Sequence, residues 1–292
     1  MKNIKIVKGK RYLVTGGSGF LGESLIKYIL DRGGLVRTIA RNEGKLVELK
    51  QKFLGGELEI FTGDIKDRFT IEQVLVGDFE GIFHLAAFKH VGLAEKQSLE
   101  CINSNLIGSM NLLEVASKKD IKFIIGISTD KAAQMVGTYG ASKFLMERLF
   151  EQYEKVFGDK TEYRIVRYGN VLYSTGSVLC KWKDLIQQGK EVIVTEPKAT
   201  RFFWSIEQAI DLIFDCLENA ENSKPYVPEM KAMSIEGLLS AMIKKYAPKD
   251  VEIPVKIIGL QAGENLHEKI LENGKYSNEV ELFTVDEIIE LI

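Results

Sequence analysis

Short apolar runs rich in β-branched and aromatic residues recur along the first part of the chain, with segments of helical periodicity between them. The runs cover residues 12–15, 35–40, 58–61, 82–86, 123–128 and 163–167. Between the first two runs, residues 21–30 have an apolar face of helical spacing, and two glycines then end the segment. Strands that alternate with helices predict an α/β fold with a doubly wound parallel sheet.

The pattern changes beyond about residue 170, where the alternation weakens and all five prolines of the chain lie. This change predicts one domain of residues 1–170 and a second, smaller substrate-side region of residues 171–292, partly interleaved with the first. Residues 205–219 and 234–246 have helical spacing, and one of these helices is expected to return to the first domain. Residues 285–292 alternate acidic and apolar positions, which predicts a solvated terminal helix.

Composition excludes several classes of protein. With 292 residues, 45% of them hydrophobic and 27% charged, the chain can build a globular core and is not a disordered protein. The formal charge of −2 provides no overall positive field, so neither a nucleic acid nor a membrane is an expected partner. No apolar stretch reaches membrane length. Three distant cysteines, and three histidines without metal-ligand spacing, predict a reducing cytoplasmic setting and no metal site.

A glycine-rich turn, Thr15-Gly-Gly-Ser-Gly-Phe-Leu-Gly22, joins the first predicted strand to the first helix. Gly16 permits a tight turn, Gly19 lets the backbone approach a pyrophosphate, and Gly22 allows close packing of the helix on the sheet. The helix N-terminus adds N–H donors and the positive end of a dipole. A purely structural turn is the alternative, but the strand before and the helix after favour a dinucleotide site. The residues predicted to form it are Gly16, Ser18, Gly19, Phe20, Leu21 and Gly22.

The end of the second strand bears on the choice of dinucleotide. An NAD-preferring site has an acidic residue here for the ribose hydroxyls, whereas this chain has Arg41, with Lys45 close behind. Arg41 could pair with a 2′-phosphate, which favours NADP, or could be an ordinary exposed arginine. After the third strand, Asp64 and the backbone amide of Ile65 could hold the adenine edge, although Asp64 could equally be a turn residue.

A cluster of residues that can carry out acid–base chemistry follows the fifth strand. It consists of Ser128-Thr129-Asp130-Lys131, and then Tyr139 and Lys143 at the start of a helix. Tyr139 and Lys143 are four residues apart and therefore lie on one helical face. An ammonium group near a phenol stabilises the phenolate and can lower its pKa from about 10 toward the working pH. Such a phenol is a general base for an alcohol.

At these residues the chain resembles the extended short-chain dehydrogenase/reductase family. Within it the chain is similar to the configuration-inverting UDP-N-acetylglucosamine 4,6-dehydratases of the polysaccharide biosynthesis proteins, in residues 88–91, 128–131, 167–171, 176–178, 200–202 and 263–268. The resemblance covers about residues 10–271 and implies a Rossmann-type domain with a C-terminal nucleotide-sugar region. It also implies UDP-GlcNAc as substrate and a homo-oligomer. Departures from the pattern concern the substrate pocket: Thr175, Cys180, Gln261, Ala262 and Asn265.

Loss of water across C5 and C6 of a hexose needs a base for the C4 hydroxyl, an acid near O6 and a base near C5. The resemblance implies Tyr139 for the first role, Asp130 for the acid and Lys131 for the C5 base. It further implies Lys143 for the phenol pKa and the ribose, and Thr129 for a hydrogen bond to O4. Because a lysine base must lose its proton, we expect Lys131 to be desolvated with a lowered pKa. A surface ion pair of Asp130 with Lys131 is the alternative.

The other predicted binding residues follow the later strands: Ala86, Ala87 and Lys89 for the cofactor, and Lys89, His90, Asn170, Arg201 and Glu264 for the substrate. An arginine fork suits a diphosphate, so Arg201 is the strongest of these. His90 could instead be structural, and Asn105 could support the active-site backbone or a water. Glu264 and His267 contact uracil or ribose in this interpretation, or merely shape a loop.

Two other functions remain open. A nucleotide-sugar 4-epimerase or reductase also uses Tyr139 and Lys143 but needs no acid and base beside Thr129, so Asp130 and Lys131 favour the dehydratase. A non-catalytic NADP-binding regulator on the same fold is the third possibility, because a fold does not dictate a function. The intact tyrosine and lysine argue against it.

Overall fold

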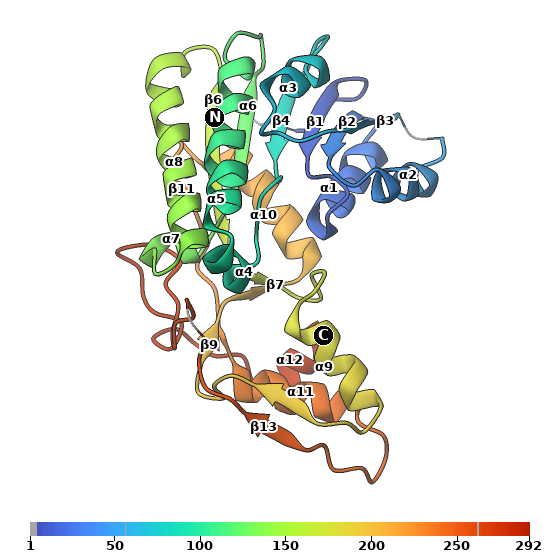
Figure 1. Cartoon of the computed structure of the whole chain (residues 1–292), viewed down its shortest axis with the longest axis vertical. Helices are drawn as coiled ribbons and strands as arrows, with labels where there is room; N and C mark the ends of the chain where they lie inside the picture. Colours follow the sequence, from blue (N-terminus) through green and yellow to red (C-terminus); the bar gives the residue numbers. More distant parts are fainter. Residues whose placement is uncertain (1–4, 56, 262) are drawn as a thin grey trace.

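The computed structural model describes residues 5–55, 57–261 and 263–292. Its main element is a seven-stranded sheet of order β11-β6-β5-β4-β1-β2-β3, in which every neighbouring pair is parallel (Figure 1). The predicted doubly wound parallel sheet is therefore confirmed, and the six predicted strands all form. The strands are β1 (Arg11–Thr15), β2 (Leu35–Ala40), β3 (Leu58–Thr62), β4 (Gly81–His84), β5 (Phe123–Thr129), β6 (Glu162–Tyr168) and β11 (Pro225–Tyr226).

Helices cover both faces of the sheet, which is the Rossmann-type arrangement. One apolar cluster packs α1 (Phe20–Asp31), α2 (Glu43–Lys52) and α10 (Ile206–Asn219) on the first face. A second cluster packs α3 (Arg68–Val74), α6 (Gly108–Ala116) and α8 (Thr138–Phe157) on the other. Strands buried on both faces explain the continuous apolar runs in the sequence. Shorter helical turns complete this part: α4 (Val91–Lys96), α5 (Ser98–Ile102), the π-helix η1 (Asn103–Ile107) and α7 (Lys131–Gln134).

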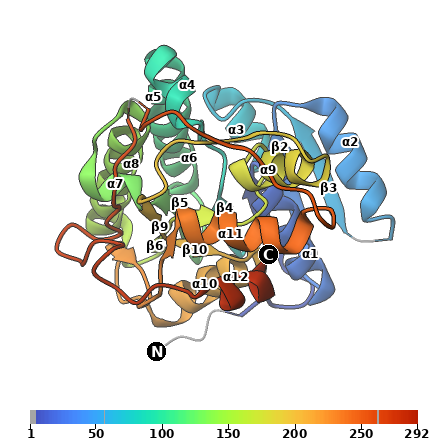
Figure 2. The same cartoon turned by 90° about the horizontal axis from the view of Figure 1, so that it is seen from below.

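The remaining elements form a smaller body below the carboxyl edge of the sheet (Figures 1 and 2). Its own apolar cluster joins α9 (Val178–Gln187), α11 (Ile235–Tyr246) and α12 (Val285–Leu291). Three two-stranded pairs accompany them: β7 (Asn170–Val171) with β10 (Phe203–Trp204), β9 (Thr200–Arg201) with β12 (Met233–Ser234), and β8 (Val192–Val194) with β13 (Val255–Ile257). Two later elements return to the large sheet, where α10 packs on one face and β11 forms an edge strand.

The terminal helix differs from its prediction. The α12 helix is not solvated all round, because Ile288 is completely buried and α12 packs against α11. Ile288 and Ile292 are one helical turn apart, so the apolar members of the alternating pattern share one face. A capping box of Thr284 and Glu287 begins the helix.

A buried ion pair fastens the C-terminal segment to the large sheet. The Arg167 guanidinium on β6 has no exposed side-chain surface and lies 2.5 Å from Glu147 on α8. It also donates to the carbonyl of Ile270 at 3.0 Å and to Glu272 at 2.8 Å. Ser128 on β5 completes the group with a 2.5 Å hydrogen bond to Glu147. One cation therefore holds two strands, one helix and the C-terminal segment together.

Removing this cation should destabilise the whole chain. Arg167→Met leaves the Glu147 carboxylate buried without its cation, and loss of one member of a buried pair costs about 3–5 kcal/mol. Urea unfolding followed by circular dichroism measures the change. Lys27→Met is the matched control, since Lys27 pairs with Asp31 on an exposed helix face, and its midpoint should stay nearly unchanged. Equal midpoints for both variants would contradict the role of Arg167.

Candidate active site

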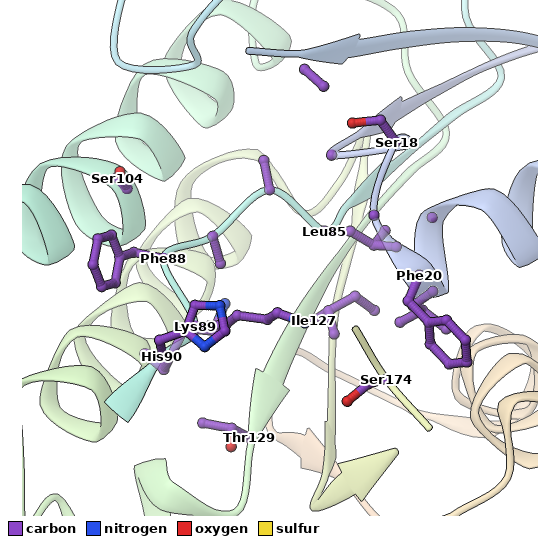
Figure 3. Close-up of a pocket in the computed structure, with 18 of the residues that line it drawn as sticks. Ser18, Phe20, Leu85, Phe88, Lys89, His90, Ser104, Ile127, Thr129 and Ser174 are labelled. Atoms are coloured by element: carbon purple, nitrogen blue, oxygen red, sulfur yellow. The ribbon is translucent and has the colours of Figure 1, made fainter. Parts of the chain in front are cut away.

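A cavity of about 650 Å³ lies at the carboxyl end of the parallel strands (Figure 3). Ligands of open parallel sheets bind at this edge, next to the strand where the order reverses. The structure brings every predicted cofactor residue to the wall of this cavity: Gly16, Ser18, Gly19, Phe20, Leu21, Gly22, Arg41, Asp64, Ile65, Ala86, Ala87, Lys89, Tyr139 and Lys143.

The turn between β1 and α1 has the shape that a pyrophosphate needs. Gly16 has φ +74°, and a Cβ on it would lie 2.9 Å from the backbone of Ala86. A Cβ on Gly22 would lie 2.5 Å from the carbonyl oxygen of Gly16. Gly19 precedes α1 and contributes no side-chain cap, so the first N–H groups of the helix remain available to an anion. These residues fit a dinucleotide.

Arg41, on which the prediction of NADP rests, and Asp64, which was expected at the adenine edge, also lie at this cavity. Arg41 lines it with a side chain that is 58% exposed, and its Nη1 is 3.4 Å from Glu100 Oε1. Asp64 lines the cavity too, and its Oδ1 accepts a 3.0 Å hydrogen bond from the backbone N–H of Lys66. The two interpretations of Asp64, turn residue and cavity residue, are therefore compatible.

Two polar side chains near the cavity, Asn105 and His84, support the structure around it. Asn105, in the π-helix, accepts from the N–H of Phe88 at 2.7 Å and donates to the carbonyl of Phe88 at 2.9 Å. It supports the backbone after β4, which was one of its two expected roles. His84 lies between Thr15 and Ser109, and burial lowers its pKa to about 3, so it is a neutral structural group.

The predicted catalytic residues meet at the end of β5 and the start of α8. Thr129, Lys131, Tyr139 and Lys143 line the cavity. Asp130 is not among the described residues that line the cavity, and its side chain is completely buried. Its Oδ1 accepts from Thr129 Oγ1 at 2.8 Å and lies 3.0 Å from Lys131 Nζ.

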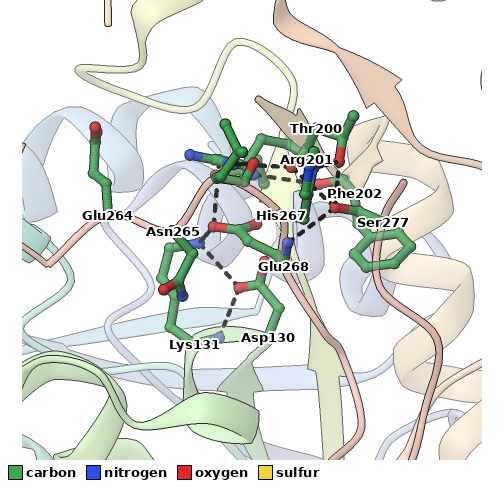
Figure 4. Close-up of polar contacts among 12 residues, drawn as sticks. Asp130, Lys131, Thr200, Arg201, Phe202, Glu264, Asn265, His267, Glu268 and Ser277 are labelled. Carbon is green, nitrogen blue, oxygen red and sulfur yellow. Dashed lines mark hydrogen bonds and ion pairs between the residues drawn. The ribbon is translucent and has the colours of Figure 1, made fainter. Parts of the chain in front are cut away.

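Lys131 differs from its prediction. Burial alone would lower its pKa, but the carboxylates of Asp130 and Glu268 outweigh burial and raise it above the ordinary value. Lys131 Nζ lies 3.0 Å from Asp130 Oδ1 and 3.1 Å from Glu268 Oε1 (Figure 4). The expected lowered pKa is therefore wrong for the free protein, because Asp130 and Glu268 together favour the ammonium form more than burial disfavours it. The pair of Asp130 with Lys131 is also not an exposed surface pair.

The phenol and the second lysine are governed by burial. Burial raises the pKa of Tyr139 to about 12, opposed by the charge of Lys131 and a hydrogen bond with Thr129. The cation that lowers the phenol pKa most is thus Lys131, whereas the prediction assigned this effect to Lys143. Burial lowers the pKa of Lys143 to about 8, and its Nζ lies 3.1 Å from the sulfur of Met146.

A second cavity of about 340 Å³ adjoins the first and shares part of its wall. The predicted substrate residues all lie there: Lys89, His90, Asn170, Arg201 and Glu264. Arg201 Nη1 donates to the carbonyls of Thr200 and Leu266, at 2.8 and 3.0 Å, so its guanidinium is held in place. Of the substituted pocket positions, Thr175 lines the second cavity, whereas Cys180, Gln261 and Asn265 do not, and Ala262 lies outside the described residues.

One residue of the site was missed. Glu268 is 4% exposed and contacts both Lys131 and Arg201, the latter at 3.4 Å. Its place in the segment 263–268 was the available signal, but sequence alone does not show that this segment reaches β5. The neighbouring His267 lies 2.8 Å from Thr200 Oγ1, so it shapes the loop.

The family model described as polysaccharide biosynthesis protein matches residues 12–288. An uncharacterized membrane protein of Methanocaldococcus jannaschii is 36% identical over 94% of this chain and 84% of its own length. The inverting UDP-N-acetylglucosamine 4,6-dehydratase of Campylobacter jejuni strain 81-176 is 34% identical over 91% of this chain and 78% of its own. The UDP-glucose 4-epimerase of Rickettsia akari is 30% identical, over 90% and 78%.

A solved structure supports the fold. Pen from Bacillus thuringiensis superposes with a TM-score of 0.92 at 24% identity, covering 99% of this chain and 98% of that protein. Among the described helices of this chain, none has the length and apolar composition to span a membrane.

The glycine turn yields a direct prediction. In Gly22→Ala the new Cβ collides with the backbone of Gly16, so the turn must shift. We expect nicotinamide dinucleotide affinity to fall at least about tenfold, or about 1.4 kcal/mol. Titration followed by intrinsic fluorescence measures it. Gly92→Ala is the control, because its Cβ meets nothing within 4 Å, and equal affinities in both variants would contradict the proposed binding surface.

Proposed function

Because this chain belongs to the polysaccharide biosynthesis protein family, we propose that it is a nucleotide-sugar 4,6-dehydratase that acts on UDP-GlcNAc with inversion at C5. The observation that carries the proposal is the meeting of Thr129, Lys131 and Tyr139 on one cavity wall with the dinucleotide loop. The product would be a UDP-4-keto-6-deoxy-L-hexosamine derivative.

The first step is oxidation at C4. A nicotinamide dinucleotide bound at the glycine turn would accept a hydride from C4 and return it to C6, so that no net oxidation remains. Tyr139 takes the proton of the C4 hydroxyl, and Thr129 hydrogen-bonds to O4. The Lys131 charge and the Thr129 hydrogen bond both favour the phenolate against the cost of burial.

The second step is loss of water, for which the C4 ketone makes the C5 proton acidic. Lys131, as the amine, takes the proton from C5, and the C5–H electron pair forms the C5–C6 double bond. Asp130, as the acid, protonates the C6 hydroxyl, which leaves as water. Asp130 Oδ2 lies beside the cavity wall at Gly169, where a Cβ would approach it to 3.2 Å. Reprotonation at C5 from the opposite face inverts the sugar.

The charged groups beside Thr129 favour this reaction over its alternatives. A 4-epimerase or reductase has no use for an acid and a base at C6 and C5, yet here Asp130 is buried and paired with Lys131. A non-catalytic regulator would not need Tyr139 and Lys143 on the cavity wall. NADP as the cofactor, a cytoplasmic location and a homo-oligomer remain predictions, the first from Arg41 and the others from the cysteines and the family resemblance.

Incubation with UDP-GlcNAc and NADP in deuterated water tests the reaction by NMR. We expect a 4-keto-6-deoxy product with deuterium at C5. Lys131→Met should lower product formation at least about 100-fold, because general-base catalysis contributes that much. Conversion to a 4-epimer without loss of water would establish the epimerase instead, and no turnover would favour the regulator.

The choice of cofactor depends on Arg41. Arg41→Ala removes a guanidinium that could pair with a 2′-phosphate, so we expect NADP affinity to fall about tenfold, equivalent to about 1.4 kcal/mol. The affinity for NAD, which lacks this phosphate, is the internal control and should stay constant. A parallel loss for both dinucleotides would refute phosphate recognition by Arg41.

A further inference from the structure

Four charged side chains from three segments form a chain of ion pairs beside the larger cavity. Arg41 follows β2, Asp64 and Lys66 follow β3, and Glu100 lies on α5. Lys66 Nζ contacts Glu100 Oε1 at 2.7 Å, Glu100 Oε2 at 3.0 Å and Asp64 Oδ2 at 3.4 Å. Arg41 Nη1 lies 3.4 Å from the same Glu100 Oε1. Glu100 therefore holds one cation from the end of each of two neighbouring strands.

The position of Glu100 is fixed mainly by Lys66. The backbone of Lys66 is held on both sides, since its N–H donates to Asp64 Oδ1 at 3.0 Å and its carbonyl accepts from Asn111 Nδ2 at 2.8 Å. Its ammonium then contacts both oxygens of Glu100. Arg41 is the longer and single contact of the carboxylate. Arg41 can therefore move away while Lys66 keeps Glu100 where it is.

Only part of this chain of ion pairs faces a ligand. Arg41, Lys45 and Asp64 line the larger cavity, whereas Glu100 and Lys66 are not among the described residues that line it. Any effect of Glu100 on a ligand of the cavity is thus exerted most directly through Arg41. The side chains of Lys66 and Glu100 are 29% and 35% exposed, so solvent screens their charges in part and the effect is modest.

A phosphate and Glu100 would compete for the same guanidinium. The 2′-phosphate of NADP carries about two negative charges, and Arg41 can bind it only with a fork whose Nη1 already faces a carboxylate. Like charges that face one cation repel each other. NAD has an uncharged hydroxyl at this position and meets no such repulsion. Glu100 therefore opposes the phosphate that Arg41 favours.

We propose that Glu100 is a positioning residue that limits the preference for NADP, by holding the Arg41 guanidinium in competition with a 2′-phosphate. This inference rests on the proposed function only in taking the cavity as a dinucleotide site and Arg41 as the partner of the phosphate. It does not depend on the chemistry of the sugar. Arg41 alone, as the sequence presents it, overstates the preference for NADP, and this chain accepts both dinucleotides.

Titration of the protein with NADP and with NAD, without a sugar nucleotide, tests the proposal by calorimetry. Glu100→Gln keeps an oxygen for Lys66 but removes the charge. We expect the Kd of NADP to fall about fivefold, the upper range for one exposed charge pair, and the Kd of NAD to stay constant. An unchanged ratio of the two constants would overturn the proposal, whether both are unaltered or both rise together, as they would if Glu100 only shaped the loop.

A matched variant separates this local effect from the change in net charge. Glu151→Gln removes the same charge from an ion pair on α8, where Glu151 Oε2 lies 2.8 Å from Arg148 Nη1. Neither residue is among the described residues that line the two cavities. Both dissociation constants should match those of the wild type. If Glu151→Gln tightens NADP as much as Glu100→Gln does, the effect is a general one and the role of Glu100 is refuted.

A double-mutant cycle tests whether Glu100 acts through Arg41. The cycle compares Glu100→Gln in the wild type and in Arg41→Ala, because only residues that interact give non-additive changes. We expect at least about half of the gain in NADP binding free energy to be lost when Arg41 is absent. A smaller loss would mean that Glu100 acts on the phosphate without Arg41, which contradicts the proposed route.

Failure of this inference is distinct from failure of the proposed function. If the protein binds neither dinucleotide, the cavity has been misassigned and the inference falls with it. If Arg41→Ala weakens NADP selectively while Glu100→Gln leaves the ratio unchanged, the phosphate partner stands and the role of Glu100 is wrong. Absence of a 4-keto-6-deoxy product from UDP-GlcNAc would refute the dehydratase and leave these binding measurements as decisive as before.

Discussion

The active site depends on one buried ion pair, Arg167 with Glu147. Burying two charges is expensive, and only good geometry and further hydrogen bonds compensate for it. Here Ser128, the Ile270 carbonyl and Glu272 complete the coordination of the pair. The result is that a C-terminal segment, far away in sequence, is fastened to the centre of the sheet. Glu268 reaches Lys131 because the chain is anchored at residues 270–272.

Residues of the same type differ in protonation at this site. Burial drives Lys143 toward its neutral form, whereas Lys131, which is partly buried, stays charged because Asp130 and Glu268 face it. Burial also drives Glu268 toward its acid form, while Asp130 stays ionised beside the ammonium. Within each pair of like groups, one thus tends to the charged form and the other to the neutral form, which is how one site can combine acid and base chemistry at a single pH.

The two cavities divide recognition between the two parts of the chain. The large sheet supplies the backbone turn between β1 and α1 and the N-terminus of α1, which suit the pyrophosphate of a dinucleotide. The smaller body supplies Arg201 and Glu264 to the adjoining cavity, and Lys89, His90 and Asn170 lie on the wall common to both. Thr129 and Lys131 lie on the wall of the larger cavity.

Sequence by itself determined the sheet, the crossover helices and the residues around the cofactor cavity, because these follow from local periodicity and from turns whose glycines have no substitute. It also identified the cluster at residues 128–143, whose members lie on one strand end and the next helix. Sequence could not show the charge of Lys131, the effect of Lys131 on Tyr139, or the presence of Glu268, nor that α12 is half buried. Each of these depends on contacts between segments distant along the chain, and a pKa is set by the groups that folding brings within a few ångströms. Only the tertiary structure decided them.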